Sequence, residues 1–187
     1  MKVAFTGSSS TGKTTLALRL QTDPRFCILL PAFITVDARR LLAERGFGSM
    51  DRMQPEELRS FQYAYLERKL ALEDGRDGYF TDRSFIDLAA YWLERDAAGL
   101  PASEVEAFVE ICRQEANRYD LHVYFPYGLI PFESDGYRSE HKIFHQRINS
   151  RICQLLHDWG HRVVCLNAID ISERCDAVIG TLQEIGT

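Results

Sequence analysis

The residues at positions 7–14, GSSSTGKT, match the pattern G-x-x-x-x-G-K-[ST]. In a loop of this pattern successive backbone N–H groups surround phosphate oxygens, and side chains at the two glycine positions would obstruct them. The lysine adds a point charge beside the β- and γ-phosphates, and the threonine hydroxyl can bind Mg²⁺. An apolar segment precedes the loop and a helical pattern follows it. We therefore expect a binding site for ATP that is formed by Gly7, Ser9, Ser10, Thr11, Gly12, Lys13, Thr14 and Thr15.

A second chemical signal is the pair Asp82-Arg83, which follows another apolar segment. A carboxylate at the C-terminal end of a strand can order Mg²⁺ waters or accept a proton from a hydroxyl group, and the arginine can hold a substrate phosphate. Motor ATPases usually place Asp-Glu here, whereas phosphotransferases of this fold favour Asp-Arg. The pair indicates a kinase with Thr14 and Asp82 as metal ligands, and a strand-end salt bridge is the alternative. Asp87 and Tyr91 follow one helical turn apart, either in the site or as a surface pair.

The signals of a GTPase are incomplete in this sequence. Residues 96–99 match D-x-x-G, but they fall at the end of an amphipathic helical segment. Residues 167–170, NAID, lack the lysine of the guanine-binding pattern N-K-x-D. We interpret both matches as coincidences, and we keep a GTPase-like switch or non-catalytic nucleotide sensor as a lesser alternative. Asn167 is expected to line the adenine pocket from the loop after the last strand.

Two arginines could close over the nucleotide. Residues 126–147 begin as a polar segment with proline and glycine directly after a predicted strand, which indicates a lid. Phosphoryl transfer depends on positive charge around the γ-phosphate and on the exclusion of water. We therefore expect Arg138 in the lid and Arg147 on the following helix to act there. A solvated helix face is the alternative for Arg147.

The apolar segments indicate how these groups are positioned. Five short apolar segments are typical of buried parallel strands, and segments of helical periodicity lie between them. This alternation predicts an α/β fold in three layers, of the P-loop NTPase type, with a five-stranded, mainly parallel sheet. We expect one domain over 1–187, with the lid at about 126–147. The expected strands are Lys2–Thr6, Phe26–Leu30, Gly78–Asp82, Leu121–Phe125 and Arg162–Leu166, and a helix is expected over Phe85–Ala98.

Composition restricts the class of protein. The 187 residues include 22 Lys and Arg against 27 Asp and Glu, and the net charge of −5 disfavours a general coat on nucleic acid. No stretch approaches the ~18 uninterrupted apolar residues of a membrane span, and the N-terminus lacks the apolar region of a signal peptide. Five scattered cysteines without a C-x-x-C pair indicate reduced thiols. We expect a cytoplasmic protein without a membrane partner.

Three segments carry a family resemblance. GSSSTGKT, TDRSFIDLAAYW and PFESDGYR, each after an apolar strand, resemble the P-loop kinase family related to ribosylnicotinamide kinases, within the nucleoside and nucleotide kinases. The resemblance spans Val3 to about Ile179. It implies ATP, Mg²⁺, a five-stranded parallel sheet and a hydroxyl acceptor held between the second strand and the helical face. Relatives often carry Glu soon after the second strand and Arg three residues later. Asp37 and Arg40 keep that spacing with a shorter acid, so Asp37 is either a catalytic base or the N-cap of its helix.

These observations lead to one main hypothesis and its alternatives. The protein is expected to be an ATP- and Mg-dependent kinase that phosphorylates a hydroxyl of a nucleoside-like small molecule. Either Asp37 or Asp82 takes the proton from that hydroxyl. The main alternative acceptor is a hydroxyl of DNA or RNA, on a modified base or a strand end, because five arginines fall between Arg39 and Arg59. Four aromatic residues form either a slot for a base or part of the core: Phe47, Phe61, Tyr65 and Trp92. The expected catalytic residues are Lys13, Asp37, Asp82, Arg83, Arg138 and Arg147.

Overall fold

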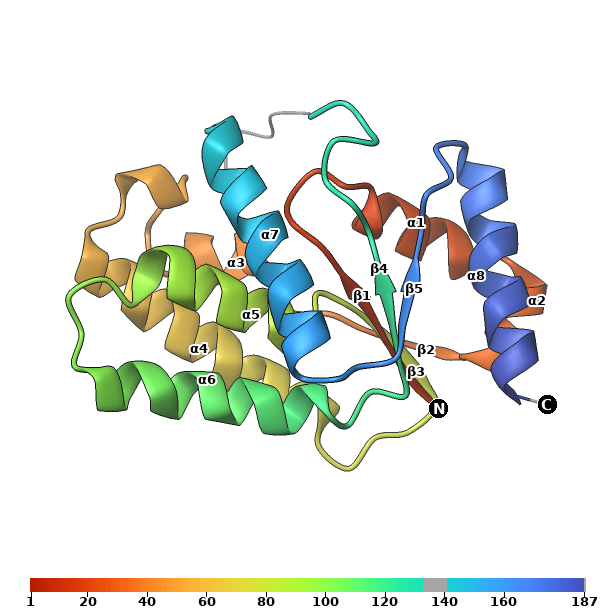
Figure 1. Ribbon diagram of the computed structural model, residues 1–187, viewed down its shortest axis with the longest axis horizontal. Helices are drawn as coiled ribbons and strands as arrows, with labels where there is room; N and C mark the ends of the chain where they lie inside the picture. The colour runs from red at the N-terminus through yellow and green to blue at the C-terminus, as the bar shows by residue number, and fades with distance from the viewer. Residues whose placement is uncertain (133–140, 187) are drawn as a thin grey trace.

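Five parallel strands form the centre of the structure (Figure 1). The computed structural model describes residues 1–132 and 141–186. Within them the strands lie in the order β2-β3-β1-β4-β5, and every neighbouring pair is parallel. This topology confirms the predicted α/β fold with a five-stranded parallel sheet. The strands are β1 (Lys2–Thr6), β2 (Ala32–Ile34), β3 (Tyr79–Asp82), β4 (Leu121–Tyr124) and β5 (Val163–Cys165).

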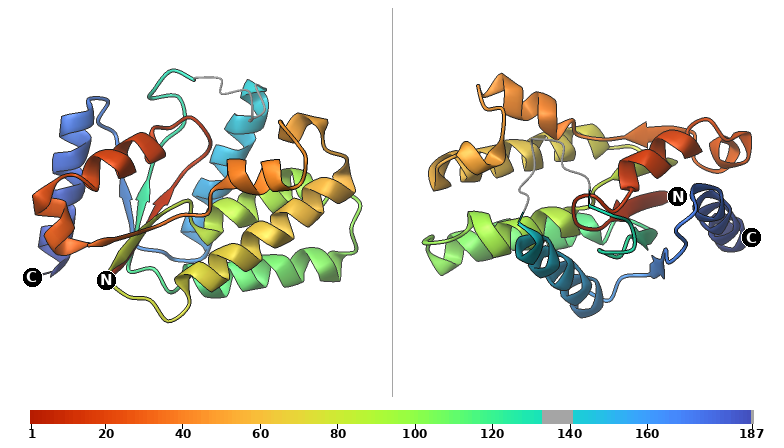
Figure 2. Two further views of the ribbon diagram at one scale, coloured as in Figure 1. Left: turned by 180° about the vertical axis from the view of Figure 1, so that it is seen from behind. Right: turned by 90° about the horizontal axis from the view of Figure 1, so that it is seen from above.

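Helices cover both faces of this sheet. They are α1 (Lys13–Leu20), α2 (Pro24–Leu29), α3 (Ala38–Glu44), α4 (Pro55–Glu73), α5 (Phe85–Tyr91), α6 (Ala102–Ala116), α7 (Lys142–Asp158) and α8 (Ile171–Gly186), with a 3₁₀ turn η1 (Met50–Arg52) and a π-helical turn η2 (Trp92–Asp96). Val3 and Phe5 of β1 pack against α1, α2 and α8, whereas Ala4 belongs to the core that α3–α7 form. Figure 2 shows these two layers on opposite sides of the sheet. Across the described part of the chain, no helix combines the length and hydropathy that crossing a membrane requires.

The predicted strand Phe26–Leu30 is wrong, because most of this segment belongs to the helix α2. Asp23 precedes the helix and accepts a hydrogen bond from the backbone N–H of Arg25. Pro24 occupies the first turn, where no backbone donor is needed. These start signals outweigh a short apolar run that fits a strand and a buried helix equally well. The second strand forms further along the chain, at Ala32–Ile34, beside β3.

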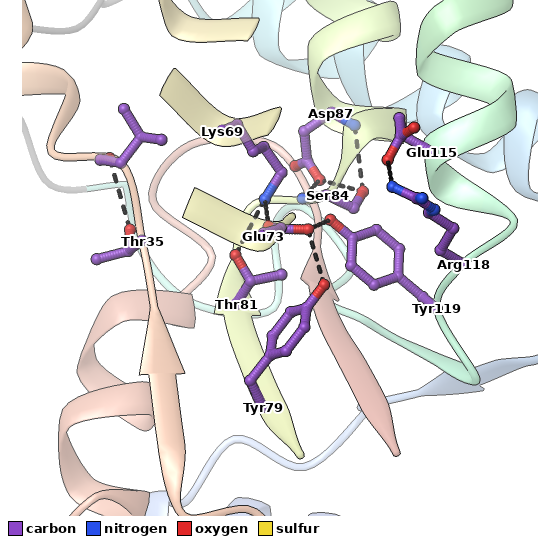
Figure 3. Close-up of polar contacts among 11 residues, drawn as sticks. Thr35, Lys69, Glu73, Tyr79, Thr81, Ser84, Asp87, Glu115, Arg118 and Tyr119 are labelled. Carbon is purple, nitrogen blue, oxygen red and sulfur yellow. Dashed lines mark hydrogen bonds and ion pairs between the residues drawn. The ribbon is translucent and has the colours of Figure 1, made fainter. Parts of the chain in front are cut away.

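A buried ion pair anchors β3 just before its last residue (Figure 3). Lys69 and Glu73 of α4 form an ion pair, and their side chains are 2% and 6% exposed. The Lys69 ammonium also donates to Thr81 Oγ1 at 3.0 Å. Glu73 accepts from the hydroxyl groups of Tyr79, at 3.0 Å, and Tyr119, at 2.7 Å. The network therefore satisfies both buried charges and fixes the strand that ends at Asp82, directly before Arg83.

Lys69→Met is expected to lower the free energy of unfolding by about 3–5 kcal/mol, because it leaves the Glu73 carboxylate buried without its cation. Denaturant unfolding of the wild type and the variant measures the difference. Arg113→Met is the matched control, since Arg113 pairs with Glu110 on the surface and exposed pairs contribute about 0–1 kcal/mol. A loss of less than about 1 kcal/mol for Lys69→Met would contradict this account of the network.

A buried histidine supports the strand that leads into the loop at 7–14. His122 of β4 is fully buried, and its Nδ1 lies 2.9 Å from the Thr6 hydroxyl. Burial, together with the nearby ring of His161, lowers the pKa of His122 to about 3 from an ordinary value of 6.5. Between these two pH values the unfolded chain binds a proton that the folded protein does not. The free energy of unfolding therefore includes a contribution that is complete above pH 6.5 and is lost as the pH falls toward 3.

Between pH 6.5 and pH 3 we expect His122 to make the free energy of unfolding fall by up to about 1.4 kcal/mol for each pH unit by which the solution becomes more acidic. Urea unfolding at several pH values in this range measures the slope, and His122→Asn removes the group that titrates. The variant should show a shallower dependence than the wild type. Equal slopes in the two proteins would refute the assignment to His122.

Candidate active site: a phosphate loop beside an aromatic pocket

The loop between β1 and α1 has the geometry that its two glycines predict. A Cβ atom at Gly7 would lie 2.6 Å from the backbone oxygen of Phe125. Gly12 has a left-handed conformation with φ of 81°, and a Cβ there would lie 2.6 Å from Nη1 of Arg174. Ser10 is also left-handed, with φ of 57°. Alternation of such conformations turns backbone N–H groups toward one centre, which makes a concave anion site at the start of α1.

Lys13 lies inside this loop. Its side chain is buried, and the ammonium donates to the carbonyl oxygens of Gly7 and Ser8, both at 2.6 Å, and to Thr11 Oγ1 at 3.1 Å. These contacts hold the positive charge of Lys13 within the loop. The loop therefore combines left-handed turns at Ser10 and Gly12, a helix N-terminus and a buried cation, and all three favour a phosphate group.

Asp82 and Thr14 meet at the end of the loop. The parallel register places Asp82 beside Phe5, so the carboxylate emerges next to the strand that carries the loop. Thr14 Oγ1 donates to Asp82 Oδ2, while Asp82 Oδ1 is buried and has no hydrogen-bond partner in the described part of the chain. A hydroxyl oxygen and carboxylate oxygens are the ligand types that Mg²⁺ prefers. The pair therefore fits a magnesium ion, to which the partnerless oxygen would offer a ligand.

Arg83 lies between the phosphate loop and α5 in a left-handed conformation, with φ of 73°. A residue with a side chain adopts this conformation at a cost, and such residues are concentrated at functional sites. The guanidinium lies 5.4 Å from the ring centre of Tyr91 and donates weakly to Ser9 Oγ at 3.4 Å. It is thus directed toward the loop.

Asp87 and Tyr91 are part of the site and are buried, so the surface-pair alternative is wrong. Asp87 Oδ1 accepts from the backbone N–H of Gly7 at 3.0 Å, and Oδ2 accepts from the N–H and hydroxyl of Ser84 (Figure 3). The Tyr91 hydroxyl lies 2.8 Å from Ser9 Oγ. Two residues of α5, one helical turn apart, therefore contact the beginning of the phosphate loop.

Two adjoining cavities occupy this region. One, of about 850 Å³, follows the phosphate loop and includes Asp37, Asp82 and Arg174 in its lining. The other, of about 60 Å³, is a narrow pocket between α4, α5 and α7. We call it the aromatic pocket; the rings in its lining are Phe61, Tyr65, Tyr91, Phe144 and His145. Both cavities are lined by Ser9, Ala38, Met50, Tyr65 and Arg83, so the two spaces share a wall.

Polar groups lie at one end of the aromatic pocket. Gln62 Nε2 donates to Asp96 Oδ2 at 2.6 Å, and Arg95 forms an ion pair with the same carboxylate. Burial raises the pKa of Asp96, while the contacts with Arg95 and Gln62 act in the opposite direction. The π turn η2 interrupts the helix that the sequence predicts as continuous over Phe85–Ala98, and it carries Arg95 and Asp96. Asp96 is therefore bound by two residues that line the pocket, Gln62 and Arg95.

The predicted aromatic slot is partly present. Phe61 and Tyr65 are buried in the core, which confirms the core interpretation, and they also line the aromatic pocket; a slot for a base stays a prediction. Trp92 is fully buried and stacks on Phe108, with ring centres 4.2 Å apart. Phe47 packs against the core from outside. The other rings of the pocket belong to Tyr91, Phe144 and His145, and the sequence alone does not show that α5 and α7 pack together.

Other predicted site residues are placed as follows. All residues of the phosphate loop from Ser9 to Thr15 line the larger cavity. Asp37 also lines it, and its Oδ1 caps α3 by accepting from the N–H of Arg40 at 3.0 Å, so the N-cap role is present. Arg147 forms an ion pair with Glu94, and neither cavity is lined by Arg147 as the described residues form them. Arg138 lies outside the described residues.

Asn167 is exposed and accepts a hydrogen bond from Cys165 Sγ, while the neighbouring Ile169, Ile171 and Arg174 line the larger cavity. Sequence reasoning missed Arg174 and Gln62, because no local pattern marks either residue. The pattern S-x-x-D at 84–87 is a capping box, but nothing in it predicts that Asp87 also binds Gly7.

Comparison with known proteins places most of the chain in one family. The sequence pattern of a family described as an AAA domain matches residues 2–174. No curated protein matches the chain in sequence. The structure of NadR protein in complex with NR is similar over 98% of this chain and 50% of that chain, with 21% identity and a TM-score of 0.65, so the chain spans about half the length of NadR. The structure of deoxyadenosine kinase from M. mycoides with bound dATP covers 98% of this chain and 100% of its own, with 11% identity and a TM-score of 0.68.

The structure of thymidylate kinase from Ehrlichia chaffeensis is similar over 98% of this chain and 98% of that chain, with 16% identity and a TM-score of 0.63. At these identities the likeness establishes the arrangement of the strands and helices. The chain therefore belongs to the AAA domain family and has the fold of the P-loop nucleoside and nucleotide kinases.

Proposed function

We propose that this protein is a kinase that transfers the γ-phosphoryl group of ATP, with Mg²⁺, to a hydroxyl group of a nucleoside-like small molecule. The observation that carries the proposal is the wall that the phosphate-loop cavity shares with the aromatic pocket. A base held in the aromatic pocket leaves its sugar at this wall, beside Ser9 and Arg83. The acceptor hydroxyl and the γ-phosphate then meet at the boundary between the two spaces, which is the positioning that phosphoryl transfer requires.

The lining of the aromatic pocket is suited to a heteroaromatic base. Flat rings favour stacking, and few polar groups are needed to fix the orientation of a ligand. Asp96 holds the amide nitrogen of Gln62, which leaves the amide oxygen as the acceptor that Gln62 can offer. Burial raises the pKa of Tyr65, so its hydroxyl remains protonated as a donor at neutral pH. A base with a donor along its edge matches this set.

The roles of the residues in the transfer follow from their positions. The loop amides and Lys13 bind the β- and γ-phosphates, and Thr14 with Asp82 would hold Mg²⁺, which neutralises phosphate charge when it is bound. The acceptor oxygen bonds to the γ-phosphorus as the bond to the β,γ-bridging oxygen breaks and ADP leaves. The proton of the hydroxyl passes to Asp37, whose Oδ1 caps α3 and whose Oδ2 remains for this purpose.

A nucleic-acid hydroxyl is less well suited to this geometry. Three arginines of the predicted basic cluster make local contacts: Arg40 pairs with Glu44, Arg59 pairs with Glu56, and Arg45 donates to the carbonyl of Ser60. The two carboxylate partners, Glu44 and Glu56, offset part of the positive charge that would attract a polymer backbone. A pocket enclosed by rings from three helices also accepts a free nucleoside more readily than a base in a strand.

The proposal is tested with ATP labelled at the γ-phosphate, incubated with separate panels of nucleosides, nucleotides and oligonucleotides, with and without a chelator of Mg²⁺. We expect label on a nucleoside or a close analogue, and no transfer when the chelator is present. Label found only in inorganic phosphate would refute the kinase proposal. Transfer to oligonucleotides alone would replace the small-molecule acceptor by the polymer.

A further inference from the structure

Arg174 is the largest buried charged group beside the phosphate loop, although it belongs to α8 at the far end of the sequence. Its side chain is 1% exposed. Nη1 donates to the carbonyl oxygen of Thr11 at 3.0 Å, and Nε donates to the carbonyl oxygen of Ala168 at 2.8 Å. The guanidinium carbon lies 5.6 Å from the ring centre of Phe125. One rigid cation thus connects the phosphate loop to the loop after β5.

The contact with Thr11 determines which way the next peptide N–H points. In a trans peptide the C=O and the following N–H point in opposite directions. Because the Thr11 carbonyl is directed outward to Arg174, the N–H of Gly12 is directed to the other side, into the phosphate loop. Gly12 favours this contact, since its φ is +81° and a Cβ there would lie 2.6 Å from Nη1 of Arg174, so that a side chain would displace the guanidinium.

We infer that Arg174 is a positioning residue for the triphosphate, which locks the Thr11–Gly12 peptide so that the Gly12 amide is ready to bind a phosphate oxygen. Arg174 contacts the loop at the Thr11 carbonyl oxygen and adds a positive charge beside the proposed phosphate site. Nη2 is buried and has no partner among residues 1–132 and 141–186, although the side chain lines the larger cavity. The guanidinium is therefore not fully used by the protein alone. This inference rests on the nucleotide half of the proposed function.

A role of Arg174 at the triphosphate can be distinguished from a role at the base of ATP. A group that acts on the Gly12 amide affects every ligand with a triphosphate, including inorganic tripolyphosphate, and leaves the binding of the acceptor unchanged. A group that stacked on the base would instead affect ATP and not tripolyphosphate. Binding of tripolyphosphate therefore separates the two roles without any need for catalysis.

The test is calorimetric titration of ATP and of tripolyphosphate, each with Mg²⁺, into the wild type, Arg174→Ala, Arg174→Lys and the surface control Arg113→Ala. Because Arg174→Ala removes charge-assisted hydrogen bonds to the loop, it should lower the affinity for ATP and for tripolyphosphate by about 10- to 100-fold. The control Arg113→Ala should leave both affinities unchanged. Arg174→Lys keeps the charge but cannot reach both carbonyl groups, so it should remain at least several-fold weaker than the wild type. Added methylguanidinium should restore binding to Arg174→Ala and not to Lys13→Ala.

Several results would overturn the inference. If Arg174→Ala or Arg174→Lys is folded, by circular dichroism, and binds tripolyphosphate as the wild type does, Arg174 has a structural role only. Loss of ATP binding alone would assign Arg174 to the base. If the alanine variant does not fold, the lysine variant and the wild type decide the question. A wild type that binds tripolyphosphate but transfers no label would refute the proposed function and leave the positioning role supported. A wild type that binds ATP and transfers label but does not bind tripolyphosphate would refute the positioning role and leave the proposed function supported.

Discussion

Lys13→Ala is expected to lower kcat/KM for phosphoryl transfer by at least ~10³-fold, because it removes the cation inside the phosphate loop. The charge that develops on the transferring group has no other buried cation within the loop. The loss should appear mainly in kcat, since Lys13 acts most strongly on the transition state. Steady-state kinetics with ATP and the acceptor found by label transfer measure it.

The control for this variant is its stability. Lys13 donates to the carbonyl oxygens of Gly7 and Ser8, so some loss of stability is expected, and thermal unfolding shows whether the fold persists. Lys13→Arg keeps the charge and changes its shape; we expect it to remain far below the wild type. A folded Lys13→Ala protein with nearly wild-type activity would mean that the loop does not serve catalysis.

Asp82→Asn is expected to reduce kcat by about 10²–10³-fold and to raise the Mg²⁺ concentration required for half-maximal activity. The substitution preserves size and a hydrogen-bond acceptor for Thr14, but it removes the negative charge that a divalent cation requires. Titration of activity with Mg²⁺ separates the two effects. If the requirement for Mg²⁺ is unchanged while kcat falls, Asp82 acts on the proton and not on the metal.

Asp37→Asn tests the other candidate for the proton acceptor, and Asp77→Asn is the surface control for both variants. Asp37→Asn keeps a side chain that can cap α3, so a fall in kcat without a change in the Mg²⁺ requirement would assign proton transfer to Asp37. Asp77 pairs with Lys2 on the surface, away from both cavities, and its replacement should leave the kinetics unchanged. Wild-type activity in Asp37→Asn would remove Asp37 from the mechanism.

The sequence predicted those parts of the site that lie within one continuous segment. The phosphate loop, from Gly7 to Thr14, carries its own conformational requirements in its glycines, and Asp82-Arg83 follows an apolar strand directly. The alternation of strands and helices then predicted the parallel sheet. Short segments were less reliable: Phe26–Leu30 has the composition of a buried strand, but Asp23 and Pro24 start a helix there.

Contacts between distant segments could not be predicted in the same way. Arg174 meets Thr11 across 163 positions of the sequence, and Asp87 meets Gly7 across 80. Gln62 and Asp96 come from different helices and become partners only when α4 packs beside η2. Arg147 shows the reverse case, because a helical arginine near a predicted lid pairs with Glu94. Charge and spacing identify candidates, whereas tertiary packing decides which of them reach the site.

The central claim is that the phosphoryl group passes across the shared wall to a small acceptor and not to water. A single-turnover experiment tests it most directly, with protein in excess over ATP labelled at the γ-phosphate and rapid quenching at successive times. With the acceptor present, we predict that most of the label appears on the acceptor within the first turnover, and that release of inorganic phosphate is slow without it. Label that passes to inorganic phosphate at the same rate, with or without any nucleoside, would contradict the account.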